Sequence, residues 1–180
     1  MPIEHAIHEG TFIELVLDGS SRRELLELVN GRDARRQGMR ALVSVVAPKC
    51  EATPDQLRDA IALLDDDDGA TLASELLFHP DVPADVLLRL ATAGKYLASI
   101  AHRRSTPREV LEVLAEKHRY PEAITTLAID HYGAPGAKAK PFRDFIARFE
   151  DVPMLEYNLR RANLDEAKRR AFLEVFGEER

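Results

Sequence analysis

The residues with the clearest capacity for chemistry are four consecutive aspartates followed by a glycine, Asp65 to Gly69. Carboxylate oxygens are the ligands that Ca²⁺ prefers, and an EF-hand loop spaces them in a fixed pattern. Aligned to that loop, four residues fall at positions that suit the pattern: Asp66, Asp68, Gly69 and Glu75. Leu64 then occupies the first ligand position, where its side chain cannot bind a metal. We therefore expect a solvated acidic turn between two helices, with no metal and no other cofactor.

Histidine and cysteine side chains can supply metal ligands, a general base or a nucleophile. The chain has six histidines and one cysteine, Cys50. His5 and His8 lie three residues apart, with no third ligand at a metal-site spacing. His79 and His102 each stand shortly before a proline, a position that suits bonding to free carbonyls at helix ends. No nucleophile lies in a recognisable motif, so we expect this chain not to be an enzyme; an enzyme whose site lacks a sequence motif is the third hypothesis.

Basic side chains could form a partner-binding patch in the second half of the chain. Residues 1–90 carry 9 Lys and Arg against 17 Asp and Glu, whereas residues 91–180 carry 16 against 14. The candidate partner-binding residues are Arg103, Arg104, Arg108, Lys117 and Arg119. A second group could extend them: Lys138, Lys140, Arg143, Arg148, Arg160 and Arg161. Glutamates are interleaved with the first group, which is typical of a solvated helix face with ion pairs between neighbouring turns.

Three proline-centred helix starts must position these side chains. Thr53-Pro54 is followed by Gln56, and Thr106-Pro107 by Glu109, so both predict a capping box with proline at the first helical position. Val82-Pro83 lacks the capping hydroxyl, and Asp81 is the expected cap instead. The prolines are 29 and 24 residues apart, within the range of helical repeats.

The residues after each proline repeat one apolar phrase. Large apolar residues stand three and seven positions past the prolines, which places them on one helix face against the core. These residues are Leu57, Val86 and Val110, then Ile61, Leu90 and Leu114. Alanine follows at the next position, where it allows close approach of a neighbouring helix: Ala62, Ala91 and Ala115. Shorter helical segments follow each phrase at residues 70–78, 96–102 and 121–130.

Helices are also predicted on both sides of the repeats. Ser21 to Glu24 forms a capping box, Gly31 suits the end of that helix, and Asp33 can cap a second helix that runs to about Ala47. Residues 131–140 form the clearest loop. Helices then begin at Pro141, at Pro153 and at a further capping signal from Asn163 to Glu166, with Gly177 as the final stop. Five of the seven phenylalanines lie after residue 140.

These patterns predict an all-α chain, with one helical domain spanning residues 1–180. Residues 1–48 are its N-terminal helices, 49–130 are about three helical repeats, 131–140 are a loop, and 141–180 are a bulkier C-terminal cap. Two helices per repeat, one of them short, is the geometry of an α-solenoid-like array.

The runs from His79 to Ala91 and from Arg104 to Ala115 resemble the leucine-rich repeat variant family, over roughly residues 42–130. The resemblance implies an α-helix paired with a 3₁₀ helix in a right-handed superhelix, and a scaffold without a reaction. The family's founding example holds an iron–sulphur centre on a cysteine cluster, which Cys50 alone cannot do. A HEAT-like helical array is the alternative.

Composition narrows the function classes. The net charge is −6 and the sequence pI about 5.6, which disfavours a general nucleic-acid binder. We see no apolar run near 18 residues and no signal peptide, so a cytoplasmic protein without a membrane span is expected. The leading hypothesis is a scaffold or protein-interaction module that uses the inner face of the helical stack. The alternative is a helical repeat that binds nucleic acid through the basic C-terminal half.

Overall fold

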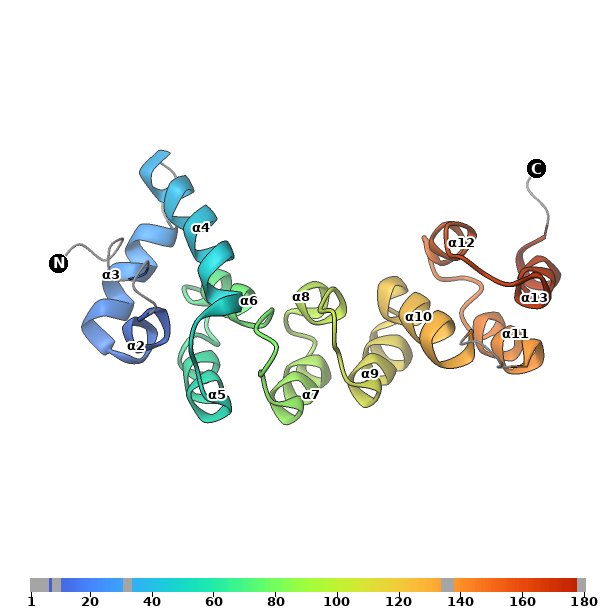
Figure 1. Ribbon diagram of the computed structural model, residues 1–180, viewed down its shortest axis with the longest axis horizontal. Helices are drawn as coiled ribbons and strands as arrows, with labels where there is room; N and C mark the ends of the chain where they lie inside the picture. The colour runs from blue at the N-terminus through green and yellow to red at the C-terminus, as the bar shows by residue number, and fades with distance from the viewer. Residues whose placement is uncertain (1–6, 8–10, 31–33, 134–137, 178–180) are drawn as a thin grey trace. The chain divides into compact units, whose positions relative to one another are not determined.

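The computed structural model describes residues 7, 11–30, 34–133 and 138–177, and this part of the chain is helical with no strand (Figure 1). The all-α prediction is confirmed. Contacts divide the chain into two compact units. Unit 1 is Met1–Arg89 with Arg103–Ser105, and unit 2 is Leu90–His102 with Thr106–Arg180. Gly31, Asp33, His5 and His8 lie outside the described residues. None of the described helices is long and apolar enough to cross a membrane.

Unit 1 packs its helices around an aliphatic core. Its elements are α2 (Phe12–Leu17), α3 (Gly19–Asn30), α4 (Ala34–Val46), the 3₁₀ turn η1 (Ala47–Lys49), α5 (Pro54–Leu63), α6 (Ala70–Leu76) and α7 (Ala84–Ala93) as far as Arg89. Helix α2 contacts α3 and α5, and α3 contacts α4 and α6. Phe12, Leu25, Leu57 and Leu72 are fully buried between them.

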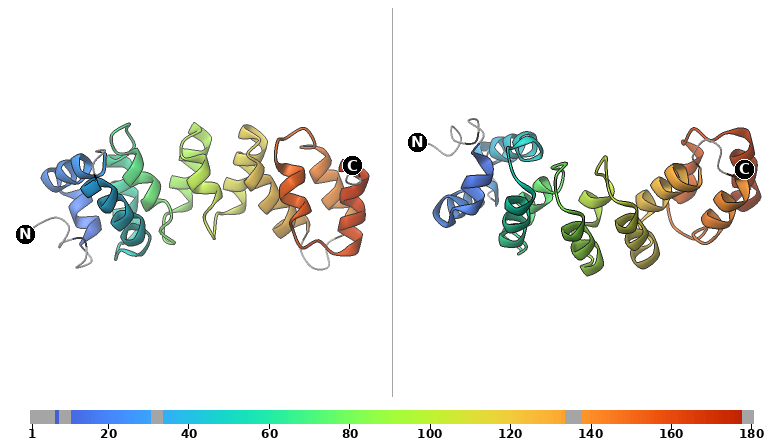
Figure 2. Two further views of the ribbon diagram at one scale, coloured as in Figure 1. Left: turned by 90° about the horizontal axis from the view of Figure 1, so that it is seen from above. Right: turned by 60° about the horizontal axis from the view of Figure 1, so that its bottom comes forward.

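Unit 2 begins at the end of α7 and holds most of the aromatic side chains. Its other elements are α8 (Leu97–Ala101), α9 (Arg108–His118), α10 (Pro121–Leu127), the π-helix η2 (Ala128–Tyr132), α11 (Ala139–Ala147), α12 (Leu155–Arg160) and α13 (Glu166–Phe176). Helix α10 contacts α9 and α12, and α11 lies beside α13 (Figures 1 and 2). Phe142, Leu159 and Phe172 are buried in its core.

The helix cap expected at Thr53 forms, and a second cap lies within the capping signal expected from Asn163 to Glu166. The Thr53 hydroxyl accepts a hydrogen bond from the Gln56 N–H at 3.2 Å, and the Gln56 side chain accepts from the Thr53 N–H at 2.9 Å. The Asp165 carboxylate accepts from the Lys168 N–H at 2.9 Å and so caps α13. Gly177 ends that helix with a φ of 79°, a conformation that favours glycine.

Other expected boundaries are wrong. Helix α3 starts at Gly19 rather than after Ser21, because the Asp18 carboxylate accepts the Ser21 N–H at 2.9 Å. Thr106 does not cap α9: its hydroxyl donates to the Ile100 carbonyl at 2.6 Å, and the helix begins at Arg108. Asp81, the expected cap of the next helix, lies three residues before α7, which begins at Ala84. The hydrogen bond that Asp81 makes is from its backbone N–H to His79 Nδ1 at 3.2 Å.

The expected loop at residues 131–140 is also shorter at both ends. The π-helix η2 continues to Tyr132, and α11 begins at Ala139, two residues before Pro141. Residues 134–137 lie outside the described part of the chain.

The apolar phrase behaves as expected at its two large positions. All six of those side chains are buried, from Leu57 and Ile61 to Val110 and Leu114. The alanine position differs between copies: Ala91 and Ala115 are buried, but Ala62 is exposed. Ala62 therefore does not mediate the close approach predicted for it.

Candidate functional site

Arg103, the first of the predicted partner-binding residues, lies in the interior of unit 1. Only 8% of its surface is exposed. Its guanidinium donates hydrogen bonds to three backbone carbonyls, those of Leu77, His79 (2.8 Å) and Pro80 (3.4 Å). Burial lowers the pKa of this guanidinium. Arg103 therefore takes no part in an exposed basic patch, because the carbonyls at the end of α6 hold it inside.

The Arg103 contact belongs to a short series of side chains that bond the backbone of an earlier segment. His79 Nε2 lies 2.9 Å from the Cys50 carbonyl oxygen, and Arg103 in turn binds the His79 carbonyl. Cys50, His79 and Arg103 each stand four residues before one of the aligned prolines, and all three are buried. We call this series the carbonyl ladder. Burial also raises the pKa of the Cys50 thiol to about 11, so at neutral pH it is not a thiolate nucleophile.

The other histidines with described contacts also bind carbonyls. His102 Nδ1 lies 2.7 Å from the Ala98 carbonyl oxygen within its own helical turn. In unit 2, His118 Nε2 lies 2.7 Å from the Ala91 carbonyl oxygen. Beside it, the Lys117 ammonium donates to the Thr92 carbonyl at 2.6 Å. Lys117 therefore caps the end of α7 rather than extending the predicted patch, although its side chain is exposed.

Three exposed arginines of unit 2 gather over aromatic rings. Arg119 lies 5.3 Å from the ring centre of Phe149, and Arg108 lies 6.0 Å from that of Tyr132. Arg148 lies 5.8 Å from the Phe145 ring and 5.2 Å from the Phe149 ring. We name this group the arginine–aromatic surface: Arg108, Arg119, Arg148, Tyr132, Phe145 and Phe149. It contains two of the five predicted partner-binding residues.

The rings of this surface form a connected row. Tyr132 stacks on Phe145 with ring centres 4.3 Å apart, and Phe145 meets Phe149 at 5.2 Å. Phe145 and Phe149 are buried. The three guanidinium groups therefore cover aromatic side chains from η2, from α11 and from the turn after α11, and cation–π attraction helps to fix their orientation.

A carboxylate pairs with each of these arginines. Arg108 Nε donates to Glu112 at 2.7 Å, which raises the pKa of the guanidinium above its ordinary value. Arg148 pairs with Glu116, and Arg119 with Asp151. Arg108, Glu112 and Glu116 share one face of α9, because they are spaced by four residues, and Arg119 follows the last residue of that helix. The surface thus combines equal numbers of cations and carboxylates.

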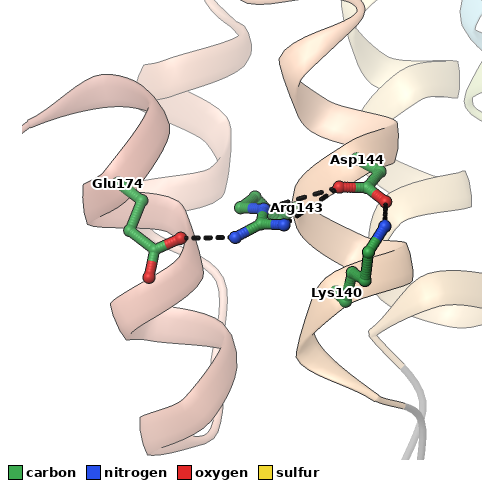
Figure 3. Close-up of polar contacts among 4 residues, drawn as sticks. All are labelled: Lys140, Arg143, Asp144 and Glu174. Atoms are coloured by element: carbon green, nitrogen blue, oxygen red, sulfur yellow. Dashed lines mark hydrogen bonds and ion pairs between the residues drawn. The ribbon is translucent and has the colours of Figure 1, made fainter.

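A second polar cluster connects α11 to α13. Arg143 lies between Glu174 and Asp144, at 2.9 Å and 3.4 Å, and the Lys140 ammonium reaches Asp144 from the other side (Figure 3). The Lys140 hydrogen bond is the main reason that the pKa of Asp144 lies below its usual range. These cations of the predicted extension therefore stabilise helix packing, and their charges are already compensated.

The acidic turn closes through its own backbone. Asp66 accepts the Gly69 N–H at 2.6 Å, and Asp65 faces Arg89 at 3.7 Å. A side chain on Gly69 would collide with the Leu64 carbonyl oxygen at 2.4 Å, so the tight turn requires glycine here. Within the described residues, no group of three or more His, Cys, Asp or Glu is placed to hold a metal ion.

Sequence patterns did not reveal the arginine–aromatic surface. Charge alone groups its arginines in the sequence, and Arg108 and Arg119 lie over rings that are 24 and 30 positions away along the chain. Arg104 is exposed. Arg160 and Arg161, two residues of the predicted extension, lie at the end of α12 and not in the arginine–aromatic surface.

Comparison of the chain with protein-family models, with curated proteins and with solved structures finds no significant match.

Proposed function

We propose that this chain is a non-catalytic scaffold or protein-interaction module whose partner binds the arginine–aromatic surface of unit 2. One observation carries the proposal: three exposed arginines are oriented by aromatic rings and by neighbouring carboxylates. Arginine and aromatic residues are enriched at protein interfaces and at their energetic centres. Side chains that are already oriented lose less conformational entropy when a partner binds.

The α-solenoid-like repeat belongs to the same proposal, as does the resemblance to leucine-rich repeat variants. It is supported by the burial of the two large apolar positions in each copy of the phrase. The carbonyl ladder supports it further, since equivalent positions make equivalent bonds to the preceding segment. A scaffold of this kind, working in the cytoplasm, needs no cofactor.

Nucleic-acid binding is the alternative function, and the ion pairs on the surface disfavour it. Affinity for nucleic acid comes mainly from cations that neutralise phosphates. Here Glu112, Glu116 and Asp151 already pair with the three arginines. A protein partner with both charges and apolar groups suits this surface better.

The test is quantitative capture from an extract of the source cell, with the full chain immobilised and captured proteins measured by mass spectrometry. The double variant Arg119→Glu/Arg148→Glu is compared with wild type and with Arg23→Glu, an exposed position on α3 in unit 1. We expect a partner that wild type and Arg23→Glu retain and the double variant loses, with circular dichroism confirming that all three are folded. Equal capture by all three would contradict the proposal. Salt-sensitive binding of DNA or RNA that the double variant abolishes would favour the alternative.

A further inference from the structure

A cavity of about 250 Å³ opens where α12 and the following turn meet α13 in unit 2. Its lining includes Leu159, Leu164, Phe172 and Leu173, together with Arg160 and Arg169. Leu159 and Phe172 are buried, so the cavity has an apolar floor. Pockets for drug-sized ligands span roughly 300–1,000 Å³. This cavity is slightly smaller, which suits a single apolar side chain of a larger partner.

One cation of this cavity resembles those of the arginine–aromatic surface, and the other does not. Arg160 lies 5.1 Å from the Phe172 ring centre and donates to Glu156 at 2.6 Å and to the Gly177 carbonyl at 3.2 Å. Arg169 is exposed, and no carboxylate in the described part of the chain pairs with it. The cavity therefore has one arginine fixed by a carboxylate and one whose charge no carboxylate among the described residues compensates.

A third arginine adds to this local positive charge. Arg161 donates to the Tyr157 hydroxyl at 2.7 Å and lies 5.4 Å from that ring, with no carboxylate partner among the described residues. Tyr157 and Met154 are exposed on the same helical segment, by 51% and 56%. Exposed apolar side chains thus lie in and directly before α12, the helix that supplies Leu159 and Arg160 to the cavity.

We propose that the α12–α13 cavity is a docking site for a protein segment in which an apolar side chain is flanked by carboxylates. The apolar side chain enters between Leu159 and Phe172, and a carboxylate pairs with Arg169. Charge complementarity selects this occupant, because a basic segment would face Arg161 and Arg169, which no carboxylate among the described residues compensates. The site shares no residue with the arginine–aromatic surface and stands independently of the function proposed for it.

The test is fluorescence anisotropy of the full chain with a labelled peptide that has one leucine between two glutamates. Two comparison peptides replace both glutamates by glutamine, or the leucine by alanine. The chain offers a matched pair of variants on α13: Arg169→Glu changes the cavity, whereas Arg170→Glu changes the adjacent residue, which faces the α11 side and pairs with Glu166 at 3.3 Å.

We expect saturable binding of the acidic leucine peptide that Arg169→Glu weakens about tenfold or more. Arg170→Glu should change the affinity by less than about twofold, and both comparison peptides should bind more weakly to wild type. Absence of saturable binding to wild type would overturn the proposal, as would equal affinity for the glutamine peptide or equal losses in the two variants. The capture of a protein partner by the arginine–aromatic surface, which tests the proposed function, does not depend on any of these outcomes.

Discussion

Arg103 of unit 1 and three arginines of unit 2 interact with their surroundings in opposite ways. In unit 1, Arg103 is buried and binds backbone carbonyls, whereas in unit 2 Arg108, Arg119 and Arg148 lie over aromatic rings and pair with carboxylates at the surface. The flanking sequences do not distinguish these roles, since Arg103 and Arg108 stand on either side of one helix start. The difference shows that the groups within reach of an arginine, backbone carbonyls or carboxylates and rings, decide whether it is buried or stays at the surface.

The energetic consequences of the two arrangements differ as well. A buried cation loses its hydration and must be compensated by hydrogen bonds, and removing the cation leaves its acceptors without partners. An exposed ion pair remains largely hydrated and contributes little to stability. The interior arginine should therefore matter for folding, and the surface arginines for binding.

The largest expected effect is a loss of stability that should be similar in the two units, since the same position of the apolar phrase is buried in each. Ile61 in unit 1 and Leu114 in unit 2 are each seven residues past their proline, and both are fully buried. Cutting either to alanine should lower the free energy of unfolding by about 2–5 kcal/mol, since it removes buried methyl groups and leaves a cavity. Thermal and urea unfolding would measure it. Arg89→Ala is the control, because that side chain is 54% exposed and its loss should cost about 1 kcal/mol or less.

The second prediction is that removing the buried arginine of unit 1 costs more stability than removing an exposed arginine of unit 2. Arg103→Ala should lower the free energy of unfolding by about 1.5–3 kcal/mol, because the carbonyls of Leu77, His79 and Pro80 lose a charged donor. Arg148→Ala should cost about 1 kcal/mol or less. Urea unfolding of both variants provides the measurement. Equal effects would mean that burial does not separate the two kinds of arginine.

An interaction could be predicted from the sequence when its two partners lie close together along the chain. The Thr53 cap was predictable because donor and acceptor lie three residues apart, and the signal from Asn163 to Glu166 located the start of α13 but did not single out its cap, Asp165. The role of Arg103 was not predictable, because its acceptors lie 23 to 26 residues earlier and are backbone atoms with no residue signature. Ser21 does not cap the helix, and the reason is local. The Asp18 carboxylate accepts the Ser21 N–H, which the Glu24 side chain would accept in a capping box.

The third prediction compares one capping signal in the two units. The Thr53 hydroxyl accepts a hydrogen bond, whereas the Thr106 hydroxyl donates one to the Ile100 carbonyl. Aspartate caps helices at least as well as threonine, so Thr53→Asp should change the free energy of unfolding by no more than about 0.5 kcal/mol. Thr106→Asp removes the donor and should cost about 1–3 kcal/mol. Paired urea unfolding curves would measure both, and a reversed order would show that the caps are misassigned.

The smallest expected effect concerns pH and the α11–α13 cluster (Figure 3). The pKa of Asp144 is lowered, first by the hydrogen bond from Lys140. Because the folded-state pKa lies below that of the unfolded chain, the unfolded state binds more protons between the two values. The stabilisation from Asp144 is therefore fully present above the ordinary aspartate pKa of about 3.9 and is lost as pH falls through the folded-state value.

This argument predicts how two variants should respond to acid. In Asp144→Asn the charge is absent at every pH, so its unfolding midpoint should lie slightly below that of wild type at neutral pH, and the two should converge below about pH 4. Lys140→Gln removes the main cause of the pKa shift and should shrink the pH-dependent difference to the part that Arg143 supplies. Thermal melts from pH 7 to pH 2.5 at low salt would measure it, since salt screens exposed pairs. A difference between wild type and Asp144→Asn that is independent of pH would show that Asp144 acts through packing and not through its charge.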